Sequence, residues 1–198
     1  MAEKFLELMV TPAVAHTQEH YFGGAMDVRG ERPRDALTND EAQFIQSRDS
    51  FYLSTVTETG WPYVQHRGGK PGFLRLVDPA TLAFADYKGN RQMLSTGNVA
   101  VNNRVGLFLM DYPQRARLKI LGHARIEDAR QRPDLVAKFS MPDAQRIVER
   151  VFLIDVVSFD WNCPKYITPR YTAVEIEAAV APLRQRIVEL ETELKTKH

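Results

Sequence analysis

The sequence predicts a mainly β fold, an antiparallel barrel or sandwich with helices at its periphery. Six or seven segments rich in β-branched and aromatic residues follow one another at short intervals, and turn residues separate them. Helical patterns are fewer and lie before, between and after these segments. A series of short strands joined by tight turns is typical of antiparallel barrels and sandwiches.

Length and composition indicate one ordinary globular domain: the chain has 198 residues, of which 44% are hydrophobic and 26% charged. A net charge of +1 gives no reason to expect a nucleic-acid partner or a membrane surface. The longest apolar run is too short to span a bilayer, and the N-terminus lacks the pattern of a signal peptide. The single cysteine, Cys163, cannot form a disulfide within the chain, so we expect a cytoplasmic protein.

The chain is expected to begin with an arm that has little regular structure of its own, over residues 1–37. A short helix should follow over 40–47, capped by Thr38 or Asn39, with Glu41 placed to reach back to the cap. The next segments, "FYLSTVT" and "WPYVQHR", form a predicted hairpin, as do "GFLRLVD" and "TLAFAD". Further strands are expected at "RVGLFLMD", "RLKILGHARIED" and "VFLIDVVSFDW", with a helix at "DAQRIVER".

A long helix is predicted over residues 174–195. Its apolar residues recur at spacings of four, three and four, at Leu183, Ile187, Leu190 and Leu194. Such a stripe is typical of a seam against the body of the protein or against a partner subunit.

The first candidate site is "FADYKGNRQMLSTGN", residues 84–98, where a strand gives way to a helix through cations and amides. A helix N-terminus offers free N–H groups and the positive end of the helix dipole to an anion. Gly89 allows close approach of the backbone, Arg91 can make a bidentate contact and Lys88 adds a point charge. The alternative is a solvated loop before an Asn-capped helix.

The second candidate is the strand in "WPYVQHRGGKPGF". Tyr63, Gln65 and Arg67 should face one way, while Val64 and His66 face the other. Buried polar side chains need partners, so this strand should line a polar groove; the alternative is an exposed edge strand. The histidines are too scattered along the chain to predict a metal site.

The third candidate is "DWNCPKYITPRY", which carries Trp161, Tyr166 and Arg170. This combination is typical of an interface or a ligand lid. Because the sequence places no base beside Cys163, a plain thiol is expected there rather than a nucleophile.

Four segments in this order, "GWPYVQHRGG", "LAFADYKGNRQ", "NNRVGLFLMDYPQRARLKILGHARI" and "DWNCPKYITPRY", resemble the pyridoxamine 5'-phosphate oxidase-like, FMN-binding split-barrel family. The resemblance is closest to its predicted flavin-nucleotide-binding subgroup and covers roughly residues 40–171. It implies a six-stranded antiparallel split β-barrel that forms a homodimer, with two FMN molecules at the subunit interface. The corresponding division is an arm over 1–37, a flavin-binding barrel over 38–171 and a C-terminal helix over 172–198.

The resemblance also implies which residues bind FMN. An Arg-Lys pair holds the phosphate in the family, and Arg91 and Gln92 occupy those positions, so Lys88 or Arg67 would supply the second charge. Arg117 and Lys119 match a region that reaches toward the flavin, where a cation stabilises the reduced form. The full implied set is Tyr63, Val64, Gln65, His66, Arg67, Asp86, Tyr87, Lys88, Asn90, Arg91, Gln92, Arg117, Lys119, Trp161 and Arg170.

The implied activity is that of an FMN-dependent oxidoreductase acting on a small substrate, with His66 and Tyr166 as weak candidates for an acid or base. The C-terminal signature that binds pyridoxal phosphate in the true oxidase is missing, so another substrate is expected. The alternatives are a flavin-binding carrier or sensor without turnover, a relative that uses deazaflavin or haem, and a dimeric barrel whose arginines only form salt bridges.

Overall fold

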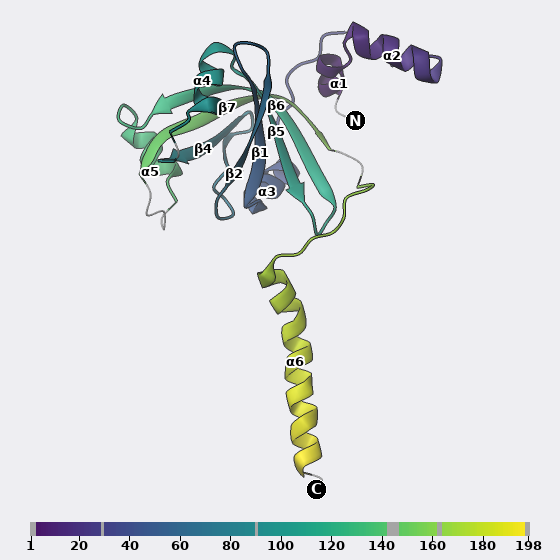
Figure 1. The fold of residues 1–198 in the computed structure, drawn as a ribbon, viewed down its shortest axis with the longest axis vertical. Helices are drawn as coiled ribbons and strands as arrows, with labels where there is room; N and C mark the ends of the chain where they lie inside the picture. The colour runs from purple at the N-terminus through teal and green to yellow at the C-terminus, as the bar shows by residue number, and fades with distance from the viewer. Residues whose placement is uncertain (1–2, 29, 90, 142–146, 162–163, 197–198) are drawn as a thin grey trace. The chain divides into compact units, whose positions relative to one another are not determined.

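A computed structural model describes residues 3–28, 30–89, 91–141, 147–161 and 164–196 of the chain (Figure 1). The chain divides into two compact units. One consists of Met1–Met110 with Arg117–Cys163, and the other of Asp111–Ala116 with Pro164–His198. The first unit holds the sheet, and the second holds the long C-terminal helix α6 (Ala173–Thr196).

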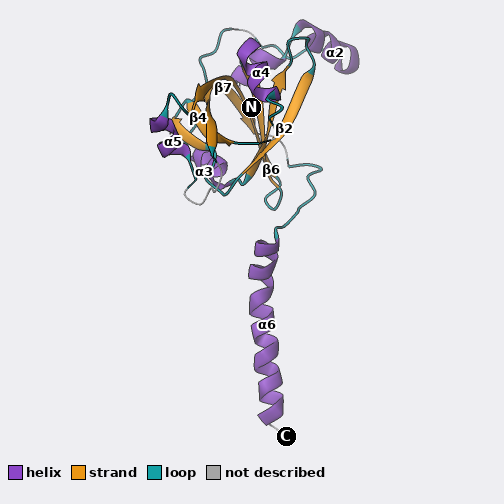
Figure 2. Cartoon of the chain, turned by 60° about the vertical axis from the view of Figure 1, so that its left-hand side comes forward, coloured by secondary structure: helices purple, strands orange, loops and turns teal. Residues whose placement is uncertain are grey.

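One seven-stranded antiparallel sheet forms the first unit (Figure 2). Its strands are β1 (Ser50–Val56), β2 (Pro62–Gly68), β3 (Arg75–Asp78), β4 (Thr81–Tyr87), β5 (Arg104–Asp111), β6 (Ala116–Asp128) and β7 (Val148–Trp161). They are ordered β2-β1-β5-β6-β7-β4-β3. The predicted mainly β class is confirmed, with one strand more than the resemblance implies.

The sheet curls on itself. Arg67 of β2 and Asp86 of β4 form an ion pair of 2.6 Å, although their strands lie near opposite ends of the sheet order. A flat sheet would keep them apart by several strand spacings, each of roughly 4.8 Å. The ion pair therefore marks where the sheet closes toward a barrel.

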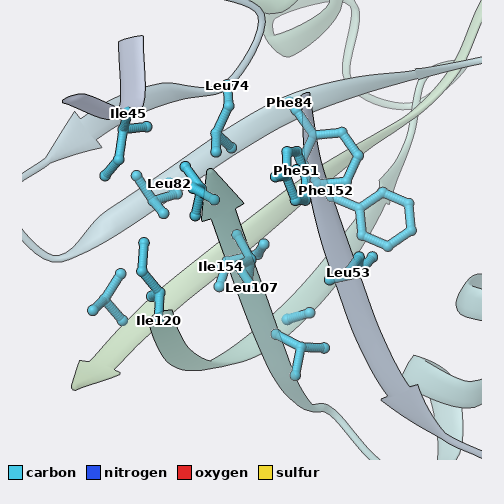
Figure 3. Packing of buried hydrophobic residues seen from close by; sticks show 14 of the residues in the cluster. Ile45, Phe51, Leu53, Leu74, Leu82, Phe84, Leu107, Ile120, Phe152 and Ile154 are labelled. Atoms are coloured by element: carbon cyan, nitrogen blue, oxygen red, sulfur yellow. The ribbon is translucent and has the colours of Figure 1, made fainter. Parts of the chain in front are cut away.

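Strand β4 is buried on both faces, as its unbroken apolar sequence "TLAFA" suggests. On one face Phe84 stacks on Phe152 at 4.8 Å between ring centroids and meets Phe51 edge-on at 5.4 Å (Figure 3). On the other face Ala83 and Ala85 pack in a second cluster with Phe139. Asp86 follows directly on these buried residues within the same strand, so the core fixes the backbone that carries its carboxylate.

Three predicted helices are confirmed. Helix α3 (Asn39–Ser47) begins with the expected capping box, in which Thr38 and Glu41 exchange hydrogen bonds. Helix α4 (Leu94–Val101) is inserted between β4 and β5, where the candidate anion-binding stretch predicts a helix start. Helix α6 also covers the range expected from its apolar stripe.

The N-terminal prediction was wrong, because residues 1–37 contain regular structure. Helices α1 (Glu3–Met9) and α2 (Pro12–Phe22) lie there, and Thr11 caps α2 with Pro12 in its first turn. Phe5 of α1 is buried, and the ammonium of Lys119 lies 4.6 Å from the centroid of its ring. This long-range contact organises a segment whose local sequence signals were weak.

The prediction of a helix at "DAQRIVER" was also wrong over the residues of this segment that the structure describes. Val148, Glu149 and Arg150 begin β7, in which Val148 and Arg150 pair with β4, while residues 142–146 lie outside the described ranges. A helix that was not predicted, α5 (Pro133–Phe139), precedes this segment. Pairing with β4 outweighs the local helical preference here, because it continues the ladder of a buried strand.

Stability should depend on the ionisation of Glu41. Its side chain is 5% exposed and accepts hydrogen bonds from the Thr38 N–H at 2.9 Å and the Trp161 indole at 2.7 Å. Burial alone would raise the pKa of Glu41. The hydrogen bonds to the carboxylate lower the pKa by more than burial raises it, so the net pKa lies below its usual value of 4.5. The contribution of the carboxylate is therefore present above about pH 4.5 and is lost as the pH falls through the lowered pKa.

We expect Glu41→Gln to reduce the free energy of unfolding at pH 7 by about 1.5–3 kcal/mol. The variant should also show a shallower loss of stability than the wild type between pH 5 and pH 3. Urea unfolding across this range measures both effects, and Asp40→Asn, at an exposed carboxylate in the same turn, is the matched control. Equal slopes for wild type and Glu41→Gln would contradict the assignment.

Candidate functional site

A cavity of about 230 Å³ lies between β2, the end of β4, the start of α4 and β7. Seven residues of the implied FMN-binding set line it: Tyr63, Gln65, Arg67, Asp86, Tyr87, Arg91 and Gln92. The fold thus brings two of the three candidate stretches together, although ten residues separate them in the sequence.

Strand β2 contributes one face to the cavity. Tyr63, Gln65 and Arg67 are half-buried and line it, whereas Val64 and His66 are exposed on the opposite face. The predicted alternation along this strand is therefore confirmed. His66 lies edge-on against Tyr52 at 5.7 Å, away from the cavity.

Asp86 is held between two arginines. Its Oδ1 accepts from Arg67 Nη1 at 2.6 Å, and its Oδ2 accepts from Arg150 Nε at 2.8 Å and Nη2 at 2.7 Å. Arg150 is the residue directly opposite Asp86 in the β4–β7 ladder, and it also meets Glu149 at 3.2 Å. The side chain of Asp86 is 9% exposed and each arginine 16%, so solvent screens this group weakly.

The guanidinium of Arg67 packs against the aromatic core. Its guanidinium lies 5.5 Å from the Phe84 ring and 5.3 Å from the Phe152 ring, measured to the centroids. Its Nε is buried and has no hydrogen-bond partner among the described atoms. A buried donor without a partner destabilises the folded protein. A ligand in the cavity that offers an acceptor to Arg67 Nε would therefore be favoured.

The loop between β4 and α4 has a special backbone. Arg91 and Met93 have φ values of 61° and 58°, in the left-handed region that residues with a Cβ rarely adopt. Met93 is the N-cap of α4, and its side chain makes no capping hydrogen bond. Leu94, Ser95 and Thr96 at the start of α4 line the cavity, so the positive end of the helix opens into it.

Helix α4 is tied to the first hairpin by side chains. Ser95 donates to Gln65 at 2.7 Å, and Asn98 donates to Thr55 at 2.9 Å in a buried hydrogen bond. These bonds fix the helix N-terminus relative to β2. The cavity wall is therefore built from secondary structure on both sides.

The charge of the cavity favours an anion. Arg67, Arg91 and Arg150 face Asp86 and Glu149, which leaves one net positive charge. Arg67 and Arg150 are already paired, whereas Arg91 is exposed and has no ion-pair partner in the described part of the chain. Arg91 is therefore the cation that is available to a ligand.

A larger cavity of about 1180 Å³ adjoins the first and shares Met93, Thr96, Glu149 and Arg150 with it. It lies among α4, β6 and β7 and includes His123 and Arg125, of which Arg125 pairs with Asp155 at 2.7 Å. Arg150 therefore stands at the boundary between the two cavities.

The structure places the remaining predicted residues elsewhere. Lys88 is exposed beside the loop and does not line the first cavity. Lys119 pairs with Asp160 at 2.9 Å, and Trp161 donates to Glu41 while packing edge-on against Phe44 at 4.7 Å.

Three further predicted residues lie outside the first cavity. Arg117 does not line it, and Arg170 lies over the Tyr112 ring at 5.0 Å within the second unit. Tyr166 is fully exposed there, with a φ of 64°. Asn90 and Cys163 lie outside the described residues.

Six lining residues were not predicted as ligands: Met93, Leu94, Ser95, Thr96, Glu149 and Arg150. The first four lie at the predicted helix start, so their backbone N–H groups could have been predicted to face a ligand. The other two lie in the segment that was expected to be helical. Recognising it as a strand would have placed Arg150 opposite Asp86.

In the ranges that the structure describes, no group of three or more His, Cys, Asp or Glu residues is placed to hold a metal ion. None of the helices in those ranges is both long and apolar enough to cross a membrane.

The chain is similar to several solved structures. A pyridoxamine 5'-phosphate oxidase candidate from Lactobacillus delbrueckii has 20% sequence identity and a TM-score of 0.50, over 63% of this chain and 93% of that one. HupZ of Group A Streptococcus has 14% identity and a TM-score of 0.49, over 68% and 99%. An FMN-binding protein from Syntrophomonas wolfei has 10% identity and a TM-score of 0.44, over 62% and 86%.

Sequence comparison gives the family. No curated protein matches the chain. The family model described as pyridoxamine 5'-phosphate oxidase matches residues 37–180, which is most of the chain and includes every element of the barrel. The chain therefore belongs to the pyridoxamine 5'-phosphate oxidase family.

Proposed function

We propose that this protein binds FMN through the 230 Å³ cavity and acts as a cytoplasmic, homodimeric, FMN-dependent oxidoreductase. The observation that carries the proposal is the uncapped N-terminus of α4, which opens into a cavity of net positive charge beside Arg91. A phosphate monoester suits this site because it accepts hydrogen bonds from helix N–H groups and from a guanidinium at the same time.

The residues present fit the phosphate end of FMN. Arg91 and the first N–H groups of α4 would bind the phosphate oxygens. Arg67 and Arg150 would add positive potential while remaining paired with Asp86, and Arg67 Nε offers a buried donor. Gly89 leaves room for close approach, because a Cβ there would meet only the Tyr87 carbonyl oxygen, at 3.7 Å.

The size of the cavity supports a site that extends beyond it. Ligand pockets usually measure about 300–1000 Å³, and the first cavity is smaller than that. The adjoining cavity is wide enough for a flat ring or a substrate. A homodimer with the cofactor between subunits, as the family resemblance implies, would supply the remaining walls.

Bound FMN would supply the electron transfer, and the chain would bind the cofactor, orient it and tune its charge. No histidine is among the described residues that line the first cavity. His66 faces the other side of β2, and Tyr166 lies in the second unit. Either can act as an acid or base only on a substrate that reaches those surfaces.

One observation favours a flavin-binding carrier or sensor as the second candidate. The two carboxylates that line the first cavity, Asp86 and Glu149, are both engaged with arginines. Their carboxylate oxygens already accept from guanidinium groups, so they offer little to a substrate.

The first experiment is the visible spectrum of the purified protein, combined with mass spectrometry of the compound that heat releases. We expect the spectrum and mass of FMN. A deazaflavin or a haem would replace this cofactor assignment, and a colourless protein that fails to take up added FMN would refute it. Reduction by NAD(P)H followed by substrate-dependent reoxidation would separate the oxidoreductase from the carrier.

A further inference from the structure

Helix α6 carries a continuous heptad repeat that the barrel site does not use. Six apolar residues recur at alternating spacings of four and three, at Ile176, Val180, Leu183, Ile187, Leu190 and Leu194. In heptad notation Val180, Ile187 and Leu194 take position a, and Ile176, Leu183 and Leu190 take position d. This strict seven-residue period is that of a left-handed coiled coil, whereas a helix packed on a globular core usually shows a wider apolar face.

The seam is exposed in the single chain. Leu183 is 64% exposed, Ile187 55% and Leu194 61%, and the described residues of α6 include no buried one. Pro182, inside the helix, takes position c, on the outer side of a coiled coil. Its ring would therefore not enter the seam.

The residue types in the seam favour a particular number of helices in the coiled coil and a particular direction of those helices. β-branched residues at a combined with leucine at d favour parallel dimers, and the central positions Val180, Leu183, Ile187 and Leu190 follow this rule. We infer that α6 pairs with α6 of a second copy of this chain, as a parallel two-stranded coiled coil.

The flanking charges agree with the parallel direction. In a parallel pair, position g faces position e of the next heptad on the other helix. Arg186 at g would then face Glu191 of the partner subunit, and the symmetry of the dimer makes this attractive pair twice. Within its own helix Arg186 makes exposed ion pairs with Glu189 at 2.9 Å and Glu193 at 3.8 Å. Exposed pairs contribute little free energy, so Arg186 can leave them for Glu191 of the partner subunit at little cost.

The antiparallel direction is disfavoured by the same charges. Keeping all six apolar residues in the seam would place position e against e and g against g. Arg184 would then face Arg184 of the partner subunit, Arg186 would face its own copy, and Glu177 would face Glu191 of the partner subunit. Like charges at such positions are repulsive, so the sequence specifies direction as well as partner.

A seam of about three heptads is at the lower limit for a coiled coil by itself. The pairing therefore gains from any second contact between the subunits, such as the barrel interface proposed above, because such a contact raises the effective concentration of α6. On this point alone the inference rests on the proposed homodimer.

Disulfide cross-linking of the full-length chain tests the inference. In a Cys163→Ser background, Leu190→Cys should convert most of the protein into a disulfide-linked dimer under mild oxidation, because equivalent d positions of a parallel pair lie side by side. The matched control is Thr192→Cys, an exposed position f on the same helix, which should remain mostly monomeric on a non-reducing gel. Equal cross-linking of the two variants, or none in Leu190→Cys, would overturn the proposal and leave α6 to the barrel or another partner.

Three further variants test the direction of the pair and the role of its charges. A cross-link in Val180→Cys/Leu190→Cys, with none in either single variant, would show an antiparallel pair and overturn the parallel assignment. Arg186→Glu should weaken cross-linking about three- to fivefold through its two symmetric pairs, and adding Glu191→Arg should restore it. Flavin content is scored separately by absorbance, so a failed cofactor assignment is distinguishable from a failed coiled coil.

Discussion

Asp86→Asn is expected to destabilise the folded protein by about 3–5 kcal/mol, because it leaves two partly buried guanidinium groups without their shared carboxylate. Asp86 contacts Arg67 at 2.6 Å and Arg150 at 2.7 Å, and the pair with Arg67 joins strands from nearly opposite ends of the sheet. Urea unfolding at pH 7 measures the loss as a shift of the midpoint.

The matched control is Asp134→Asn. Asp134 pairs with Arg132 at 2.7 Å, but its side chain is 62% exposed, so the loss of stability should be much smaller than in Asp86→Asn. Inorganic phosphate should stabilise Asp86→Asn more than the wild type, because the variant has one more net positive charge in the cavity. Similar unfolding midpoints for Asp86→Asn and Asp134→Asn would show that Asp86 does not hold the barrel closed.

Arg91→Ala is expected to weaken FMN binding by about 1.5–3 kcal/mol, which is roughly a ten- to hundredfold rise in Kd. Arg91 lines the cavity, is exposed and has no ion-pair partner in the described ranges, so its removal leaves the rest of the site intact. Titration with FMN and with riboflavin, followed by flavin fluorescence, measures the effect. The affinity for riboflavin should hardly change, because riboflavin lacks the phosphate.

Arg115→Ala is the control for the backbone. Arg115 is also exposed and also left-handed, with a φ of 53° against 61° for Arg91, but it lies in the turn between β5 and β6. Both substitutions therefore cost the same in backbone strain, and only Arg91→Ala should affect FMN. An unchanged Kd for Arg91→Ala would refute the phosphate assignment.

Much of the site could be predicted from local sequence. The alternation of Tyr63, Gln65 and Arg67 along β2 follows from the geometry of a strand, and the helix start after Gly89 follows from its turn chemistry. The capping box of α3 and the heptad of α6 are likewise local patterns. In each case the interacting groups lie within a few residues of one another, so the spacing alone determines which side chains meet.

Long-range pairing decided the remainder. The family resemblance implies that Arg67 contacts the cofactor, and this stays a prediction. Only the curled sheet brings its guanidinium to Asp86, and only the β4–β7 register places Arg150 opposite that carboxylate. The same register turned the expected helix at Val148–Arg150 into strand, and Phe5 gave structure to an arm without strong local signals.

The sequence by itself therefore determined most of the element types, the polar face of β2, the helix start after Gly89 and the repeat of α6. Only the tertiary structure decided which arginine is available to a ligand and which is held by a carboxylate. The physical reason is that the energy of a buried ion pair depends on the separation and burial of its charges. Both are set by how distant strands pack, and neither is encoded within a few residues of Arg67, Asp86 or Arg150.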